Sequence, residues 1–209
     1  MKGRFITVEG LEGAGKSTAI EAITTWLKSH GKTFIETREP GGTGLGEGVR
    51  ALLLDPRQAS VSPIAELLLI CAARAQHIAE KIRPALESGT WVVCDRFADA
   101  TFAYQGGGRE IAWHKIEQLA AMVQDGLQPD LTLLLDIDPD EGLSRVDGRG
   151  KRDRFEIEES AFFDRVRAAY RRCVREAPER FAVIDAAQSM NEVASEIHAV
   201  LASRAQAWR

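Results

Sequence analysis

The segment "ITVEGLEGAGKST", residues 6–18, decides the fold class of this chain. Ile6, Thr7 and Val8 are apolar or β-branched residues that predict a short strand, and the run from Gly15 onward predicts the start of a helix. Between the strand and the helix lies a loop with few side chains. A strand that turns into a helix through such a loop is the first unit of an α/β fold with a parallel sheet.

The composition of the loop is typical of an anion-binding site. Residues 10–17, "GLEGAGKS", fit the pattern G-x-x-x-x-G-K-[ST], in which backbone N–H groups and the helix start surround phosphates. Lys16 would reach the β- and γ-phosphates, and Ser17 could ligate Mg²⁺. A glycine-rich turn with a solvated lysine is the alternative interpretation. The nucleotide-binding residues predicted here are Gly10, Leu11, Glu12, Gly13, Ala14, Gly15, Lys16, Ser17 and Thr18.

Length and composition indicate one domain over residues 1–209, with 44% apolar residues available for its core. The formal net charge of −4 argues against a protein that wraps nucleic acid. Neither a signal peptide nor a run of roughly 20 apolar residues is present in the sequence, so we expect no membrane span. Cys71, Cys94 and Cys173 are few and widely spaced, which favours buried reduced thiols and a cytoplasmic location.

Short apolar segments alternate with helical patterns along the chain. The alternation predicts a parallel sheet covered by helices on both faces, because parallel neighbours need long crossovers. The strands predicted are "RFITVE" (4–9), "TFIET" (33–37), "TWVVCD" (90–95), "LTLLLD" (131–136) and "RFAVID" (180–185).

Helix boundaries are marked by glycine, by proline and by capping residues. Gly31 predicts a helix end, and Ser62 followed by Pro63 predicts a helix start. Residues 154–180 carry apolar side chains at helical spacing between charges, which is typical of an ordinary amphipathic helix. Capping-box spacing occurs at Asp138 with Glu141 and at Ser189 with Glu192.

Charged residues follow the predicted strands, where ligands bind in parallel α/β sheets. Arg38 and Glu39 follow the second strand, and Asp95 and Arg96 end the third. Residues 148–156, "GRGKRDRFE", add a basic segment that could be a hydrated loop or a lid over a triphosphate. A carboxylate with several cations beside a phosphate loop suits phosphoryl transfer, although exposed ion pairs would leave the same pattern.

Several motifs in one order resemble bacterial thymidylate kinase. They are "EGLEGAGKST", "TREPGGT", "AAR" with a following Gln, "CDRF" followed by "AYQGGGR", and "PDLTLLLD". The resemblance implies a P-loop NTPase fold with a five-stranded parallel sheet, and transfer of the γ-phosphate of ATP to dTMP, giving dTDP, with Mg²⁺. It also implies a homodimer and a lid near residues 146–156.

The resemblance also implies residue roles at the acceptor. Arg74 would donate to thymine O4, Gln105 would read the base edge, and Thr101 would lie close to its N3 side. The residues implied at the monophosphate end are Arg38, Glu39 and Arg96, with Glu12 near the sugar 3′-hydroxyl and the attacking phosphate, and Asp95 on Mg²⁺ or its water.

The resemblance also indicates where the charge-stabilising arginine lies, and it leaves one departure at Ile70. Gly13 stands where some family members carry a catalytic arginine, which implies that Arg149 in the lid stabilises transition-state charge, with Arg154 as second candidate. Ile70 stands where the family commonly stacks a phenylalanine on thymine, so an aliphatic side chain would cover the base instead.

Three alternatives stay open on the residues alone. A kinase for another small acceptor, such as a deoxynucleoside or shikimate, would share the phosphate loop but need a positioned base for a neutral hydroxyl. A switch-type GTPase or a nucleotide-sensing module would also share it, although the sequence lacks an N-K-x-D motif. Residues 65–76, apolar nearly all round, could be central core or a dimer contact.

Overall fold

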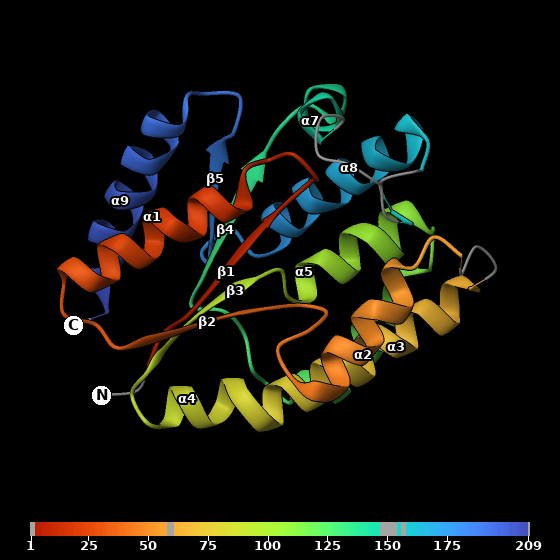
Figure 1. Cartoon of the computed structure of the whole chain (residues 1–209), viewed down its shortest axis with the longest axis horizontal. Helices are drawn as coiled ribbons and strands as arrows, with labels where there is room; N and C mark the ends of the chain where they lie inside the picture. Colours follow the sequence, from red (N-terminus) through yellow and green to blue (C-terminus); the bar gives the residue numbers. More distant parts are fainter. Residues whose placement is uncertain (1–2, 58–60, 147–153, 156–157, 209) are drawn as a thin grey trace.

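The structure is a computed structural model that describes residues 3–57, 61–146, 154–155 and 158–208 (Figure 1). Within these residues a five-stranded sheet has the order β2-β3-β1-β4-β5, and every neighbouring pair is parallel. The predicted strands are confirmed to within one residue at each end. Their bounds are β1 Phe5–Gly10, β2 Phe34–Arg38, β3 Trp91–Asp95, β4 Leu131–Asp136 and β5 Phe181–Asp185.

The two faces of the sheet have separate apolar layers, because neighbouring side chains on a strand point in opposite directions. Ile6 and Val8 of β1 pack with the helix α1 (Lys16–Ser29), which lies against α9 (Met190–Ala207) (Figure 1). Phe5 packs instead with the π-helical segment η1 (Ile78–Ile82). The sheet is therefore buried on both faces, as its nearly continuous apolar strands require.

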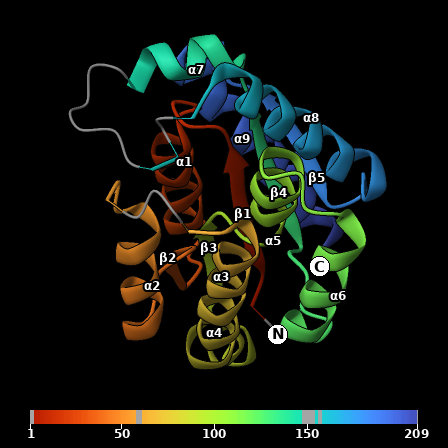
Figure 2. The same ribbon diagram turned by 90° about the vertical axis from the view of Figure 1, so that its right-hand side faces the viewer.

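The remaining helices surround the sheet (Figures 1 and 2). Figure 2 shows α2 and α3 side by side, and the two helices share a small apolar cluster. The bounds are α2 Gly44–Leu54, α3 Pro63–His77, α4 Arg83–Glu87, α5 Ala98–Thr101, the π-helical η2 Phe102–Gly108, α6 Trp113–Gln124, α7 Pro139–Val146 and α8 Ser160–Glu176. None of the described helices is long and apolar enough to cross a membrane.

Most predicted helix boundaries are confirmed. Ser62 caps α3 by accepting a hydrogen bond from the Ala65 N–H, and Ser189 forms a capping box with Glu192 at the start of α9. Helix α7 begins directly after Asp138, as the spacing of Asp138 and Glu141 predicts. Asp138 accepts from the Asp140 N–H, and Glu141 pairs with Arg145 one helical turn later.

Strand register brings the charged motifs to one edge of the sheet. Asp95 at the end of β3 is level with Arg38 of β2 and with Val8 of β1. The phosphate loop follows β1 directly, and Gly10 is level with Leu135 of β4. The carboxyl ends of three strands therefore bring these residues to the same edge of the sheet, as the sequence predicts.

Candidate active site

The phosphate loop runs from the buried strand β1 into α1. Gly15 precedes the helix at φ 87°, a left-handed conformation that favours glycine, and no side chain caps the helix start. The first N–H groups of α1 therefore have no side-chain partner and can donate to an anion. Ser17 is exposed and Thr18 is half-buried on the first turn, beside these groups.

Lys16 is the first residue of α1, and its side chain contacts the loop. Its Nζ donates to the carbonyl oxygens of Gly10, at 3.2 Å, and Leu11, at 2.9 Å. Burial, followed by the nearby charge of Arg96, lowers the pKa of Lys16 to about 8. A bound polyphosphate would offset both effects and raise the pKa of Lys16, because its negative charge favours the protonated amine.

Gly13 is glycine for a steric reason. Its φ is 73°, and a Cβ there would lie 2.7 Å from the Gly142 carbonyl carbon of α7 and closer still to its oxygen. The loop therefore cannot carry an arginine at this position without displacing α7. This packing agrees with the interpretation that a catalytic arginine must come from elsewhere in the chain.

Arg96 is the centre of a polar cluster below the loop. Its guanidinium donates to Glu12, at 2.8 Å, and to the hydroxyl oxygens of Tyr104 and Tyr170, both at 3.0 Å. Burial opposes ionisation of Glu12, but the Arg96 and Lys16 charges hold the pKa of Glu12 below its ordinary value. Tyr170 also donates to Glu9. Burial, and then the nearby charge of Asp99, raise the pKa of Glu9 to about 8. Glu12 therefore acts as the counter-charge that holds Arg96.

Asp95 carries the orphaned polar atom of the site. Among the described residues, its Oδ1 is the buried side-chain oxygen or nitrogen that has no hydrogen-bond partner. The described part of the chain contains no cluster of three or more His, Cys, Asp or Glu side chains that could hold a metal unaided. A lone carboxylate oxygen beside a phosphate loop fits Mg²⁺, which usually keeps its waters and binds one or two carboxylates plus substrate phosphates.

A cavity of about 350 Å³ opens between the phosphate loop and α3. It brings together most of the residues that the sequence predicts for substrate and catalysis. These are Glu12, Gly13, Lys16, Glu39, Ile70, Arg74, Asp95, Arg96, Thr101 and Gln105. The cavity is also lined by Pro40, Arg50, Leu53, Leu54, Phe97, Ala100, Tyr104 and Phe155.

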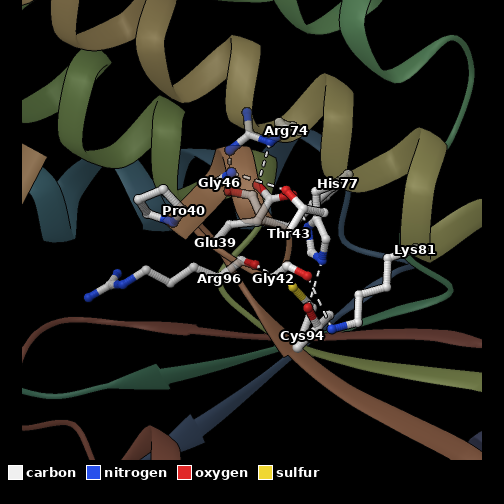
Figure 3. Close-up of polar contacts among 12 residues, drawn as sticks. Glu39, Pro40, Gly42, Thr43, Gly46, Arg74, His77, Lys81, Cys94 and Arg96 are labelled. Carbon is white, nitrogen blue, oxygen red and sulfur yellow. Dashed lines mark hydrogen bonds and ion pairs between the residues drawn. The ribbon is translucent and has the colours of Figure 1, made fainter. Parts of the chain in front are cut away.

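Glu39 lines the cavity and holds Arg74. Arg74 and His77 lie one turn apart on α3, and both contact the buried Glu39 carboxylate (Figure 3). Arg74 donates to it at 2.6 Å, and His77 Nδ1 is hydrogen-bonded to its other oxygen at 2.9 Å. His77 also bonds Thr37, at 2.6 Å. Burial opposes the charge of Arg74, but Glu39 raises the pKa of Arg74 above its ordinary value. A second nitrogen of Arg74 donates to Thr101 Oγ1, at 2.8 Å.

Arg38 and Arg50 differ in how they lie relative to the cavity, and sequence reasoning names only Arg38. The Arg38 side chain is 50% exposed, pairs with Glu47, and is not among the described residues that line the cavity. Arg50 of α2 does line the cavity and donates to the Pro40 carbonyl oxygen, at 3.0 Å. Arg50 precedes the cavity residues Leu53 and Leu54 by three and four positions, so the three share one face of α2. This spacing is the signal that could identify Arg50.

Of the two arginines considered for the lid, the structure describes only Arg154. Arg149 lies outside the described residues. Arg154 is buried, donates to the Leu53 carbonyl oxygen and is ion-paired with Glu66 of α3. Arg154 is thus held between α2 and α3 and is not among the described residues that line the cavity. Tyr104, Tyr170 and Glu66 are further polar residues of the site to which sequence reasoning assigns no role. Tyr104 stands in the motif "AYQGGGR", whereas Tyr170 and Glu66 belong to ordinary helical patterns.

Comparison with known proteins places this arrangement in a family. A family model described as thymidylate kinase matches residues 8–197. A thymidylate kinase of Chromohalobacter salexigens is 55% identical over 208 residues, which are 99% of this chain and 98% of that protein. One of Hahella chejuensis is 53% identical over 97% of this chain and 98% of that protein. The crystal structure of thymidylate kinase from Ehrlichia chaffeensis aligns with a TM-score of 0.77 at 34% identity, covering 96% of this chain and 99% of that one.

Proposed function

The chain belongs to the thymidylate kinase family, and from this premise we propose how its residues bind the two nucleotides and transfer the phosphoryl group. The protein is an enzyme that uses ATP to phosphorylate dTMP, giving dTDP, on a P-loop NTPase fold. One observation carries the assignment of residues. The cavity is continuous from Lys16 of the phosphate loop to Arg74 and Gln105 of the opposite wall, so it can hold donor and acceptor in line.

The thymine base occupies the apolar end of the cavity in this proposal. Ile70, which is 8% exposed, covers the base face in place of an aromatic ring. Arg74 donates to thymine O4, and Gln105 and Thr101 face the N3 side. The fixed direction of Arg74 supports this assignment, because Glu39 and Thr101 hold two of its nitrogens.

The phosphates of ATP and dTMP meet at the cationic end. The acceptor oxygen of dTMP is already anionic near neutral pH, so the reaction needs no strong general base and depends on offsetting repulsion between two polyanions. Lys16, Arg96 and Arg50 supply positive charge there, and Arg149 supplies it to the transferring group. Glu12 orients Arg96 and lies near the sugar 3′-hydroxyl and the attacking phosphate.

Ser17 and Asp95 would hold Mg²⁺. The unpartnered Oδ1 of Asp95 and the exposed hydroxyl of Ser17 support this proposal. A bound Mg²⁺ would neutralise charge that develops on the β- and γ-phosphate oxygens. Asp95 itself is placed by β3, and its backbone carbonyl accepts from the Glu39 N–H, at 2.9 Å, which ties the metal side of the cavity to the base side.

A homodimer and a cytoplasmic location complete the proposal. Exposed apolar residues on α3 follow helical spacing, namely Ile64, Leu68, Ala72 and Ala75, and they support a contact between two copies. Cys71, Cys94 and Cys173 are buried free thiols, which support a reducing compartment.

A coupled assay of ADP release tests the acceptor. We expect dTMP to give the highest kcat/KM, dUMP to be slower, and dCMP and thymidine to give little product. Slow ADP release that does not depend on any acceptor would contradict the proposed site and favour a nucleotide hydrolase.

A further inference from the structure

Glu66 is a buried carboxylate that the proposed mechanism does not use. It lies in the first turn of α3 and its side chain is 0% exposed. Gln105 donates to its Oε1 through Nε2, at 2.9 Å, and Arg109 donates to the same oxygen, at 3.3 Å. Arg154 is ion-paired with its other oxygen. Three donors therefore converge on one carboxylate, two from η2 and its C-cap and one from residue 154.

This convergence determines which way the Gln105 amide points. Guanidinium groups have only donors, so a Glu66 side chain that faces two of them presents acceptor oxygens. The Gln105 terminus beside it must then be the NH₂ group, and the carbonyl oxygen Oε1 must be the other end. Gln105 lines the cavity and is 2% exposed, and no described residue donates to its Oε1.

We propose that Glu66 is a positioning residue for base recognition: it fixes the Gln105 amide so that an acceptor oxygen, and not a donor, faces the nucleobase. This inference rests on the proposed function, in which Gln105 reads the base edge. Arg74 presents the complementary donor, because Glu39 and Thr101 occupy Nε and one terminal nitrogen and leave the other terminal nitrogen for the ligand.

A donor beside an acceptor selects one class of base. Thymine and uracil present a carbonyl oxygen at position 4 and an N–H at position 3, which match the donor of Arg74 and the acceptor of Gln105. Cytosine presents an amino group and an unprotonated ring nitrogen, so both of its contacts would be reversed. A site built to hydrogen-bond one pattern rejects the other strongly, because its buried polar groups are left unpaired.

The test uses dUMP and dCMP, which differ only at this edge and share the absence of the methyl group. Their dissociation constants are measured by titration calorimetry without ATP, together with kcat/KM, for the wild type and for Glu66→Gln. A glutamine at 66 that keeps its carbonyl oxygen toward Arg154 turns its own NH₂ toward Gln105 and Arg109, so the Gln105 amide must then flip. We expect the preference for dUMP over dCMP to fall at least about tenfold, with a smaller change in the KM for ATP.

Two further variants separate the possible failures. Arg109→Gln removes one donor of Glu66 but leaves the bond to Gln105, so the preference for dUMP should stay within about twofold of wild type. Gln105→Met removes the amide. If Gln105→Met lowers the preference and a folded Glu66→Gln does not, the role of Glu66 is refuted while the proposed base site stands.

If Gln105→Met also leaves the preference unchanged, the proposed base site itself is wrong. Thermal unfolding shows whether Glu66→Gln is folded. Should it not fold, Glu66→Asp keeps the charge for the arginines but draws the oxygens away from Gln105. A lowered preference for dUMP in that variant supports the proposal, and an unchanged preference overturns it.

Discussion

Arg96 shows how a single residue combines strain and chemistry. It is a non-glycine residue at φ 67°, and its backbone N–H still donates to the Val8 carbonyl oxygen, at 2.9 Å. Such a conformation costs about 1–3 kcal/mol and persists where the surroundings over-determine it. Here Glu12, Tyr104 and Tyr170 provide that constraint, and the side chain is delivered to the phosphate end of the cavity.

Lys16 predicts a pH dependence of nucleotide binding. Its pKa of about 8 in the free protein must rise when a triphosphate binds, so binding takes up a proton once the lysine is partly neutral. We expect uptake of about half a proton per ATP at pH 8 and close to one at pH 9, with affinity falling up to about tenfold per pH unit above 8. Calorimetry in buffers of different ionisation enthalpy measures the uptake.

The control for this prediction is Lys16→Arg, whose guanidinium does not titrate in the range. It should bind ATP without proton uptake at either pH. Equal uptake by the variant and the wild type would assign the proton to another group.

Arg149 carries a second prediction at the scale of a residue. Arg149→Ala should lower kcat by at least about a hundredfold, with a smaller change in the dissociation constants of both nucleotides, because the charge it offsets develops in the transition state. Arg154→Gln is the matched comparison. Since Arg154 is paired with Glu66, it should change dTMP affinity more than kcat. Wild-type turnover by Arg149→Ala would remove the residue from the mechanism.

At the scale of an element, η2 is the segment that joins the proposed base site to the polar cluster around Arg96. It continues α5 as a π-helical stretch from Phe102 to Gly108 and carries both Tyr104 and Gln105. Helix α8 packs closely on it, since a Cβ on Gly107 would lie 2.5 Å from the Arg165 carbonyl oxygen. The glycines of "AYQGGGR" therefore permit α8 to approach, and α8 in turn delivers Tyr170 to Arg96.

Gly108 makes this packing testable. A Cβ there would lie 2.5 Å from Cζ of the buried Phe162 ring, so Gly108→Ala should destabilise the protein by about 1–3 kcal/mol and weaken dTMP binding through the displaced η2. Gly48→Ala is the matched control. It is exposed in the middle of α2 with nothing within 4 Å of the new Cβ, and should stabilise by about 0.5–1 kcal/mol.

Urea unfolding of both glycine variants measures these differences. If the two variants have the same free energy of unfolding, the close approach of α8 to η2 does not limit what residue 108 can be.

For the whole molecule, the proposed homodimer would form through the exposed stripe on α3, namely Ile64, Leu68, Ala72 and Ala75. The exposed stripe on α3 lies on the helix whose opposite side carries Glu66, Ile70, Arg74 and His77 to the cavity and its supports. A contact along this stripe would hold in place the helix that orients the base-reading groups. Dimerisation and acceptor binding would therefore share one structural element.

Leu68, whose exposed fraction is 51%, predicts the consequence. Leu68→Lys should convert the dimer into a monomer at micromolar concentration, because each contact would bury two unpaired ammonium groups. Sedimentation velocity measures the change. Met190→Lys makes the same charge change at a residue that is 71% exposed at the start of α9, and should leave the dimer intact. A dimeric Leu68→Lys variant would place the interface elsewhere.

The strands, the phosphate loop and most helix boundaries follow from the sequence alone, because the signals that specify them act over a few residues. Gly31 ends α1 and Ser62 begins α3 through bonds to near neighbours, and the loop of residues 10–17 needs only its own glycines. The motifs after β1 and β3 meet at one edge because parallel strands share a direction.

The partners of each charged side chain are decided only by the tertiary structure. Glu12 and Arg96 are 84 residues apart, Tyr170 and Glu9 are 161 apart, and Glu66 meets Arg154 across 88 residues. Arg38 and Arg50 look alike in the sequence, yet one faces solvent and the other faces the cavity. The side chain alone determines which chemistry a residue can perform, but its contacts depend on how distant helices pack on the sheet.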